Sequence, residues 1–180
     1  MAVLDCYFEN FTNLSFRDFN STNKLEGVFA NFIKPPHRFE FIGNIKGVNF
    51  INDSKATNID AMLKAIKAAN EIKKTKDIYL ICGGDLKNQN IASVNLTEVQ
   101  KIKNAIIFGK DKEIIFKSIN EFTTCNLVGD LKEAVAHALK ISSAGDYIML
   151  SPACSSLDMY KDYKERGNEF KKIVSDLADE

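Results

Sequence analysis

The chain of 180 residues contains no tryptophan, only three prolines and two histidines, and no excess of charge of either sign. Lys plus Arg and Asp plus Glu both number 24, so no net field favours nucleic acid or an acidic surface as a partner. The apolar runs are only a few residues long, whereas a transmembrane helix needs about 20. With 45% hydrophobic and 27% charged residues, the composition is that of an ordinary globular protein. We therefore expect no nucleic-acid partner and no membrane partner.

The cysteines also lack a pattern that would give them a special role. There are four, Cys6, Cys82, Cys125 and Cys154, with no C-x-x-C spacing and no clustered histidine. This argues against a metal site and favours reduced thiols, as in a cytoplasmic protein. No His or Asp is spaced to activate Cys154, so we expect it to be packed under its turn and not to act as a nucleophile.

From about residue 37 onward, short apolar segments alternate with segments of helical periodicity. Strands are expected at 39–42, 48–51, 78–82, 105–108, 126–128 and 147–150, and helices at about 57–73, 110–120, 130–140 and near the end of the chain. Short apolar strands separated by helices are typical of a parallel sheet covered on both faces. The expected fold class is α/β and Rossmann-like, with a mostly parallel sheet, one antiparallel strand from an opening hairpin, and helices on both faces.

Three predicted strands end in polar turns. The first polar turn is 52–58 (NDSKATN), the glycine turn is 83–87 (GGDLK), and the closing turn is 151–158 (SPACSSLD). Each has a purely structural interpretation, since Asn, Asp and Ser are common turn formers and Thr57 with Asp60 fits a helix capping box. Three such turns after strands instead favour a ligand site at one edge of the sheet.

These turns, with two further motifs, resemble the C-terminal domain of the Mur ligases. Residues 36–40 (PHRFE) resemble the domain junction of that family. Residues 52–58, 83–87 and 151–158 resemble three of its strand-end turns, and 166–170 (RGNEF) resembles its closing signature. Two departures are visible: Leu86 stands where the family often has Gly, and Tyr163 stands where it usually has Phe.

The resemblance implies an organisation and an activity. It makes residues 36–180 an amino-acid-binding C-terminal domain, and residues 1–35 a helical remnant of the preceding central ATPase domain and its linker. The family uses ATP to activate a carboxylate as an acyl phosphate, which the amine of an amino acid then attacks. The motifs are most similar to those of the member that adds D-glutamate, which implies D-glutamate, ATP and UDP-N-acetylmuramoyl-L-alanine as ligands of a monomeric enzyme.

The resemblance also implies roles for individual residues. For D-glutamate binding it implies Thr57, Lys87, Ser156, the main-chain N–H of Leu157, and Tyr163 packing beside the ligand. Without the resemblance, Lys87 in its polar loop would be interpreted as a solvated lysine.

Three further roles concern catalysis and ATP. By resemblance, Lys55 lies near the reacting centre or near a carboxylate of the glutamate, and it is the catalytic candidate. Asp53 meets the ribose of ATP, and Arg38 meets its phosphates. Arg38 could alternatively pair with Glu40 or cap the preceding helix. Residues 166–168 are expected to hold the last turn in shape and not to touch substrate.

Some parts of such an enzyme cannot be found. No G-x-x-x-x-G-K-[ST] loop occurs in the sequence, so we expect the phosphate cradle, the Mg²⁺ ligands and the uridine-diphosphate pocket to lie outside this chain. The chain alone is expected to be inactive. Alternatives are the equivalent domain of another Mur ligase or of a folylpolyglutamate synthetase, or a non-catalytic Rossmann-like nucleotide-binding module. The last would favour a G-x-G-x-x-G after the first strand, and none is present.

Overall fold

The structure, a computed structural model, describes residues 35–72, 76–91 and 94–178. Contacts group residues Pro36–Glu180 into one compact unit. Residues 1–34, which belong to the expected helical remnant of a preceding domain, lie outside the described residues. Among the helices that the structure describes, none is long and apolar enough to cross a membrane.

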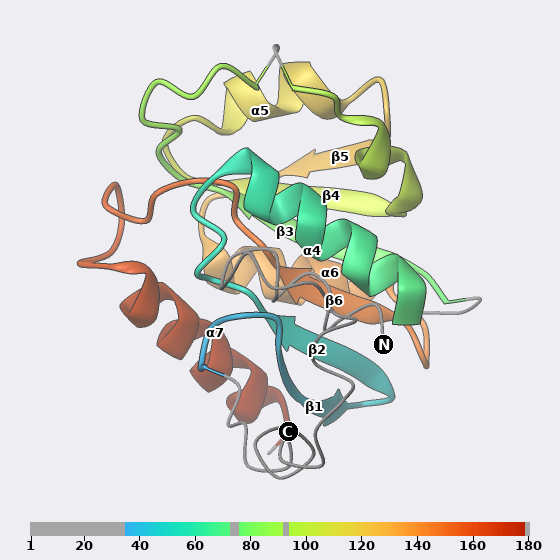
Figure 1. Ribbon diagram of the computed structural model, residues 1–180. Coiled ribbons are helices and arrows are strands. Elements are labelled where there is room, and N and C mark those ends of the chain that lie inside the picture. Colours follow the sequence, from blue (N-terminus) through green and yellow to red (C-terminus); the bar gives the residue numbers. More distant parts are fainter. Residues whose placement is uncertain (1–34, 73–75, 92–93, 179–180) are drawn as a thin grey trace, which may run out of the picture. The chain divides into compact units, whose positions relative to one another are not determined.

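The core of this unit is a six-stranded sheet of order β1-β2-β6-β3-β4-β5 (Figure 1). All neighbours are parallel except β1 and β2, which form the expected antiparallel hairpin. The strands are β1 (Glu40–Ile45), β2 (Val48–Asn52), β3 (Ile78–Gly83), β4 (Asn104–Phe108), β5 (Thr124–Leu127) and β6 (Tyr147–Leu150). The predicted α/β fold with one antiparallel strand is confirmed.

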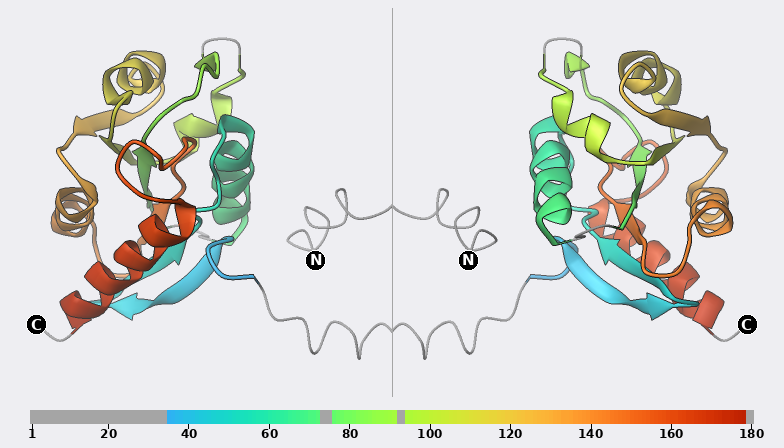
Figure 2. Two further views of the ribbon diagram at one scale, coloured as in Figure 1. Left: turned by 90° about the vertical axis from the view of Figure 1, so that its left-hand side faces the viewer. Right: turned by 90° about the vertical axis from the view of Figure 1, so that its right-hand side faces the viewer.

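Helices cover both faces of the sheet, as Figure 2 shows. They are α4 (Ile59–Ile72), the 3₁₀ helix η2 (Thr97–Lys101), α5 (Lys112–Ile119), α6 (Leu131–Ile141) and α7 (Tyr163–Ala178). One apolar cluster joins α4, η2 and α5 to the sheet, and a second joins α6 and α7 to its other face. Every residue of β3 and β4 is buried, which explains why these strands read as continuous apolar runs.

Two local predictions can be compared with the observed hydrogen bonds. In the sequence, Asp130 with Glu133 three residues on predicts a cap for the helix expected at 130–140. The Asp130 carboxylate accepts a hydrogen bond from the Glu133 N–H at 2.8 Å, which confirms this cap of α6. The capping box predicted from Thr57 is wrong by one residue, because Asn58 Oδ1 accepts from the Ala61 N–H at 2.8 Å. Helix α4 therefore begins at Ile59, and Thr57 belongs to the turn before it.

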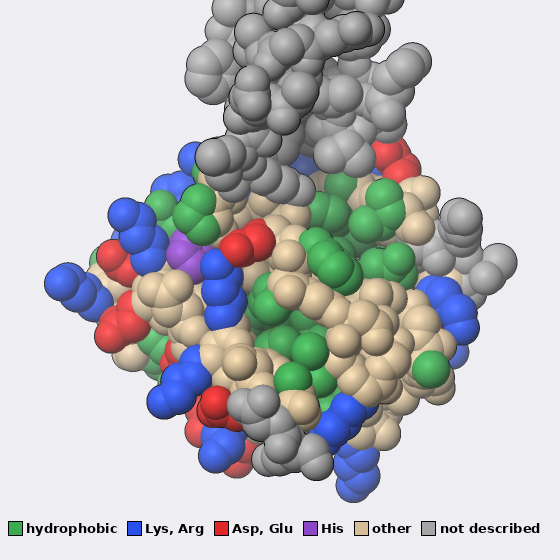
Figure 3. Space-filling model, turned by 90° about the horizontal axis from the view of Figure 1, so that it is seen from below, with side chains coloured by type: hydrophobic (Ala, Val, Ile, Leu, Met, Phe, Trp, Pro, Cys, Tyr) green, Lys and Arg blue, Asp and Glu red, His purple; other side chains and the backbone are tan. Residues whose placement is uncertain are grey.

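The antiparallel strand β1 forms one edge of the sheet. The predicted strands left residues 43–47 as the turn to β2. The observed turn is shorter, because only Lys46 and Gly47 connect the strands, and both have positive φ. Phe41 in β1 is 60% exposed. Viewed from below, the molecule shows hydrophobic side chains grouped on this side with charged ones around them (Figure 3).

Candidate functional site

The sheet order brings the three predicted turns together. Strand β6 lies between β2 and β3, so the carboxyl ends of all three strands meet at one edge. Backbone hydrogen bonds then join the turns: Asp53 N–H donates to the Leu150 carbonyl at 2.8 Å, and Gly83 N–H donates to the Pro152 carbonyl at 2.9 Å. The predicted convergence of the turns is therefore observed.

The side chain of Arg166, in α7, links the first polar turn to the closing turn. This side chain is fully buried, and it donates to Ser54 Oγ at 3.0 Å, to the Ser54 carbonyl at 3.0 Å and to the Cys154 carbonyl at 3.1 Å. No other buried arginine is present among the described residues, and its Nη1 has no hydrogen-bond partner there. Burial lowers the pKa of this guanidinium to about 10. The expectation that this segment holds the last turn in shape is confirmed.

Asp53 has an internal role that the sequence did not reveal. One carboxylate oxygen accepts a hydrogen bond from the Phe39 N–H at 2.9 Å, and the other accepts from Ser151 Oγ at 2.9 Å. The residue is only 8% exposed. Asp53 thus ties the segment that carries Arg38 to the end of β6, in addition to the expected contact with ribose.

Lys55 and Tyr163 lie against each other. The Lys55 ammonium is 4.1 Å from the centroid of the Tyr163 ring, a cation–π contact that restrains a flexible side chain. The Ser54 hydroxyl donates to the Tyr163 carbonyl at 2.8 Å, which fixes the start of α7 next to the first polar turn. Two residues that resemblance assigns to the same site are thereby placed side by side.

His37 anchors the segment before β1. Its carbonyl accepts from the Lys55 N–H at 3.0 Å, and its Nδ1 lies 3.0 Å from the Asn52 side-chain amide, from which it can accept. A Cβ on Gly167 would overlap the His37 ring, so a glycine is needed for this close approach to α7. The suggested pairing of Arg38 with Glu40 is not what the structure shows, because Glu40 binds Lys171 and the His37 N–H instead.

The glycine turn is joined to the closing turn by a short antiparallel bridge. Asp85 N–H donates to the Ser155 carbonyl at 3.1 Å, and Ser155 N–H donates to the Asp85 carbonyl at 2.9 Å. Gly84 has a φ of +128°, and a Cβ there would overlap the Ser155 carbonyl oxygen. This position therefore requires glycine if the bridge is to form.

Lys87 follows on an exposed, strained segment. Both Lys87 and Asn88 have positive φ, at 48° and 65°. Two carboxylates hold the segment: Asp85 Oδ1 accepts from the Lys87 N–H at 2.8 Å, and Asp111 Oδ2 accepts from the Leu86 N–H at 2.8 Å. Lys87 is thereby presented to solvent from a fixed backbone.

The remaining candidates lie in the first and closing turns. Thr57 is half-buried, Ser156 is 3% exposed and the Leu157 side chain is 58% exposed. The Ser156 carbonyl accepts hydrogen bonds from the N–H groups of Met159 and Tyr160, at 3.1 and 2.8 Å. The backbone of the closing turn is therefore fixed around Ser156 without help from another domain.

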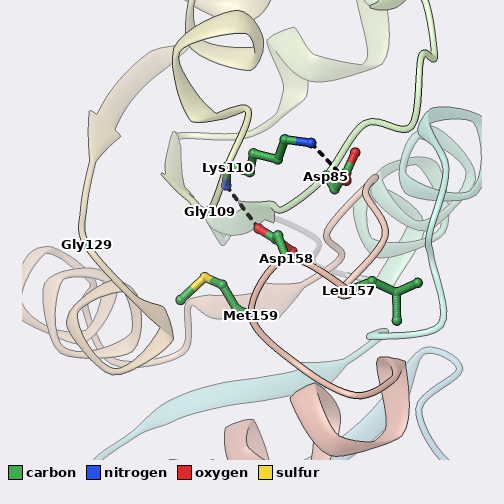
Figure 4. A pocket seen from close by; sticks show the side chains of 7 residues that line it. All are labelled: Asp85, Gly109, Lys110, Gly129, Leu157, Asp158 and Met159. Carbon is green, nitrogen blue, oxygen red and sulfur yellow. Dashed lines mark hydrogen bonds and ion pairs between the residues drawn. The ribbon is translucent and has the colours of Figure 1, made fainter.

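An open groove adjoins the closing turn, on the side of β4 and β5 (Figure 4). It is lined by Asp85, Gly109, Lys110, Gly129, Leu157, Asp158 and Met159. Its charged groups bind one another, with Lys110 Nζ 3.2 Å from Asp85 Oδ2 and the Lys110 N–H donating to Asp158 Oδ2 at 2.9 Å. Within the described ranges, no group of three or more His, Cys, Asp or Glu could hold a metal ion.

Cys154 is part of the closing turn, and its side chain is fully buried. Burial raises the pKa of its thiol to about 12, so the nucleophilic thiolate is scarce at neutral pH. The prediction that Cys154 is packed and not nucleophilic agrees with this environment.

Comparison with known proteins identifies the family. Residues 37–154 match the family described as "Mur ligase, glutamate ligase domain". This chain belongs to the Mur ligase family. Similar proteins include the UDP-N-acetylmuramoylalanine–D-glutamate ligase of Alkaliphilus metalliredigens, with 42% identity over 82% of this chain and 32% of that protein. The ligase of the same name from Bdellovibrio bacteriovorus is 38% identical over 89% of this chain and 34% of that protein. The chain thus spans about a third of the length of these relatives.

Solved structures of other ligases and synthases share the fold at low sequence identity. The murein peptide ligase of Psychrobacter arcticus has a TM-score of 0.58 and 14% identity, covering 84% of this chain and 31% of that one. The bifunctional folylpolyglutamate synthase/dihydrofolate synthase of Yersinia pestis has a TM-score of 0.56 and 12% identity, covering 88% of this chain and 34% of that one. Such likeness shows the fold alone.

Proposed function

We propose that this Mur ligase domain binds D-glutamate for an ATP-dependent ligase that joins it to UDP-N-acetylmuramoyl-L-alanine through an acyl phosphate. The observation that carries the proposal is the meeting of three turns at one sheet edge. Thr57, Lys87 and Ser156 come from the ends of β2, β3 and β6, which are neighbouring strands. The resemblance of the motifs implies that these residues contact the amino acid, and they lie on turns that are bonded to one another.

The chemistry of the ligand fits these side chains. D-Glutamate carries two carboxylates, which must be desolvated and held so that its amine faces the acyl phosphate. In our proposal Lys87 supplies a positive charge, while Thr57, Ser156 and the Leu157 N–H supply short donors. The Tyr163 ring packs beside the ligand's side chain.

In our proposal the other charged residues serve the phosphoryl chemistry. Lys55, restrained on the Tyr163 ring, neutralises charge near the reacting carboxylate. Arg38 meets the phosphates of ATP and Asp53 meets its ribose, while the Asp53 carboxylate also fixes the backbone next to Arg38. Mg²⁺ and the uridine nucleotide bind outside the described residues. We place the enzyme, a monomer, in the reducing cytoplasm, where buried free thiols such as Cys82 persist.

Among related substrates, the sequence comparison favours D-glutamate. The fold is shared with a folylpolyglutamate synthase, so it does not discriminate between amino-acid acceptors. The relatives at 42% and 38% identity, by contrast, are both named for D-glutamate addition.

An NMR titration of the chain with D-glutamate tests the proposal. The turns are rigid but open to water, so we expect a Kd of about 1 mM or weaker. Amide shifts are expected at residues 54–58, 84–87 and 155–157. Shifts centred on the other edge of the sheet, or equal shifts with L-alanine, would contradict the assignment.

The ATP part of the proposal has a separate test in the intact ligase. Asp53→Ala is expected to weaken ATP binding more than D-glutamate binding, because it removes the ribose contact and releases the backbone beside Arg38. Equal effects on the two ligands would limit Asp53 to ordering the first polar turn.

A further inference from the structure

Gln89 lies two residues beyond Lys87 and bonds to both of the other turns. Its side-chain Oε1 accepts a hydrogen bond from the Ile59 N–H at 3.1 Å. Its Nε2 donates to the Ala153 carbonyl at 3.3 Å. Its own N–H donates to the Leu86 carbonyl at 2.9 Å, which closes the strained segment that carries Lys87. One residue thus contacts all three elements from which the proposed ligand contacts come.

The two side-chain partners are close in sequence to proposed ligand residues. Ile59 is the first residue of α4 and follows Thr57 by two positions. Its N–H is one of the helix-terminal donors that no carbonyl of the helix can satisfy. Ala153 precedes Ser156 by three positions and has a φ of +61°, which is unfavourable for alanine. Gln89 therefore caps a helix and holds a strained backbone at the same time.

The segment that carries Lys87 needs such an external hold. Lys87 and Asn88 both have positive φ, a conformation that costs a non-glycine residue free energy and persists only where the surroundings enforce it. Asp85, within the glycine turn, accepts from the Lys87 N–H, and Asp111, after β4, accepts from the Leu86 N–H. Gln89 fixes the other end of the segment against the first and closing turns.

We propose that Gln89 is a positioning residue for D-glutamate, which acts by holding Lys87, Thr57 and Ser156 at fixed mutual distances. The inference deepens the proposed function and rests on it for the identity of the ligand. Gln89 itself does not touch substrate in this proposal. Its contribution is pre-organisation, which lowers the entropy lost when a small flexible ligand is bound.

Gln89→Leu is the decisive variant, because leucine fills similar space and forms neither side-chain bond. Gln100→Leu is the matched control, since Gln100 is exposed on η2, away from the three turns. In the ligand-free chain, we expect Gln89→Leu to shift the amides of Lys87, Ile59 and Ala153. The three-bond HN–Hα coupling of Lys87, which reports its φ, is expected to change as well, whereas the control leaves both unchanged.

The second readout is ligand affinity. We expect Gln89→Leu to raise the Kd for D-glutamate about tenfold in the NMR titration. In the intact ligase it is expected to raise the KM for D-glutamate by a similar factor, with the KM for ATP within about twofold of the parent. Gln89→Glu keeps an acceptor for the Ile59 N–H but cannot donate to Ala153, so we expect an intermediate loss. Gln89→Glu also provides the affinity measurement if Gln89→Leu does not fold.

The outcomes separate this inference from the proposed function. Unchanged Lys87 coupling and unchanged amide shifts in ligand-free Gln89→Leu would overturn the positioning role, whatever the ligand. An unchanged D-glutamate Kd would overturn it as well. A parent chain that shows no D-glutamate shifts at the three turns would contradict the proposed function, while the ligand-free coupling would still decide whether Gln89 positions Lys87.

Discussion

The two halves of the proposed site are constructed differently. The buried side chain of Arg166 joins the first polar turn to the closing turn. A hydrogen bond between Asp53 and Ser151 also joins the two turns, and both residues are at most 8% exposed. The segment that carries Lys87 lies on the surface, in a strained conformation held by Asp85, Asp111 and Gln89.

In the proposed site, contacts for one ligand therefore depend on the fold to different degrees. In the buried half, we expect a substitution that loosens the turns to lower both ligand affinity and the free energy of unfolding, because buried hydrogen bonds hold the turns that carry the proposed contacts. In the exposed half, stability and binding are separable, since the side chain that faces the ligand packs against little else. Four predictions test this contrast.

Arg166→Ala is expected to have the largest effect. It leaves the carbonyls of Ser54 and Cys154 without donors in a buried site and opens a cavity, which we expect to destabilise the chain by about 3 kcal/mol. For a chain of this size that lowers the Tm by about 6–12 °C in thermal unfolding. Lys172→Ala on the exposed side of the same helix is the control, with little change expected. Equal stabilities of the two variants would show that the buried guanidinium is dispensable.

Gly84→Ala is expected to come next. The added Cβ would overlap the Ser155 carbonyl, so the bridge between the glycine turn and the closing turn must open, at a cost of about 2 kcal/mol. Gly43→Ala is the matched control, because its Cβ would meet only Ile45 Cδ1 at 3.9 Å. Urea unfolding measures both. A loss confined to Gly43→Ala would refute the role given to the bridge.

Lys87→Ala is expected to affect binding and leave stability nearly unchanged. Loss of one charge-assisted contact of roughly 1.5–3 kcal/mol raises the KM for D-glutamate about 10- to 100-fold in the intact ligase, and raises that for ATP far less. The Tm is expected to stay within about 2 °C, because the exposed side chain packs against little. An unchanged KM for D-glutamate would remove Lys87 from the site.

The smallest expected effect concerns pH. Burial and the nearby Lys171 lower the pKa of His37 from its ordinary value of 6.5, while Glu40 and Asp162 act in the opposite direction. The unfolded chain therefore takes up this proton first as the pH falls. The stabilisation is present above pH 6.5 and is lost as the pH falls below it. We expect the Tm to decrease modestly between about pH 6.5 and pH 5.

Two variants assign this pH dependence. His37→Gln is expected to remove it, because glutamine does not titrate. His137→Gln, on the partly exposed side of α6, is expected to retain it. The same slope of Tm against pH in parent and His37→Gln would place the titrating group elsewhere.

Much of the fold follows from sequence pattern. Helix α6 could be placed because a capping box and an apolar periodicity agree at Asp130, and the final strand was predicted at 147–150, where β6 lies. The start of α4 was misplaced by one residue, because Thr57 and Asn58 are both good caps and only the turn geometry selects between them. The position of β6 between β2 and β3 could not be predicted from periodicity alone, because strand order depends on pairing between segments that are far apart in the sequence.

The turns that form the proposed site could be located from the sequence, but the contacts that join them could not. The three turns were visible as polar runs after apolar strands, and Lys87 and Ser156 came from motif resemblance. Gln89 gave no signal, because a glutamine in a polar loop has no characteristic spacing. The internal bonds of Asp53 were equally hidden, since its two partners are 14 and 98 residues away in sequence.

The central place of β6 has a consequence for how the chain acquires its structure during synthesis. Strands β2 and β3 do not pair with each other; each pairs on its inner side with β6, which ends at Leu150. Until the ribosome has delivered that strand, the inner edges of β2 and β3 stay open, and such edges can pair with the wrong partner. The sheet can therefore be completed only after residues 147–150 have been synthesised, and a nascent chain stalled before residue 147 leaves both of these edges exposed.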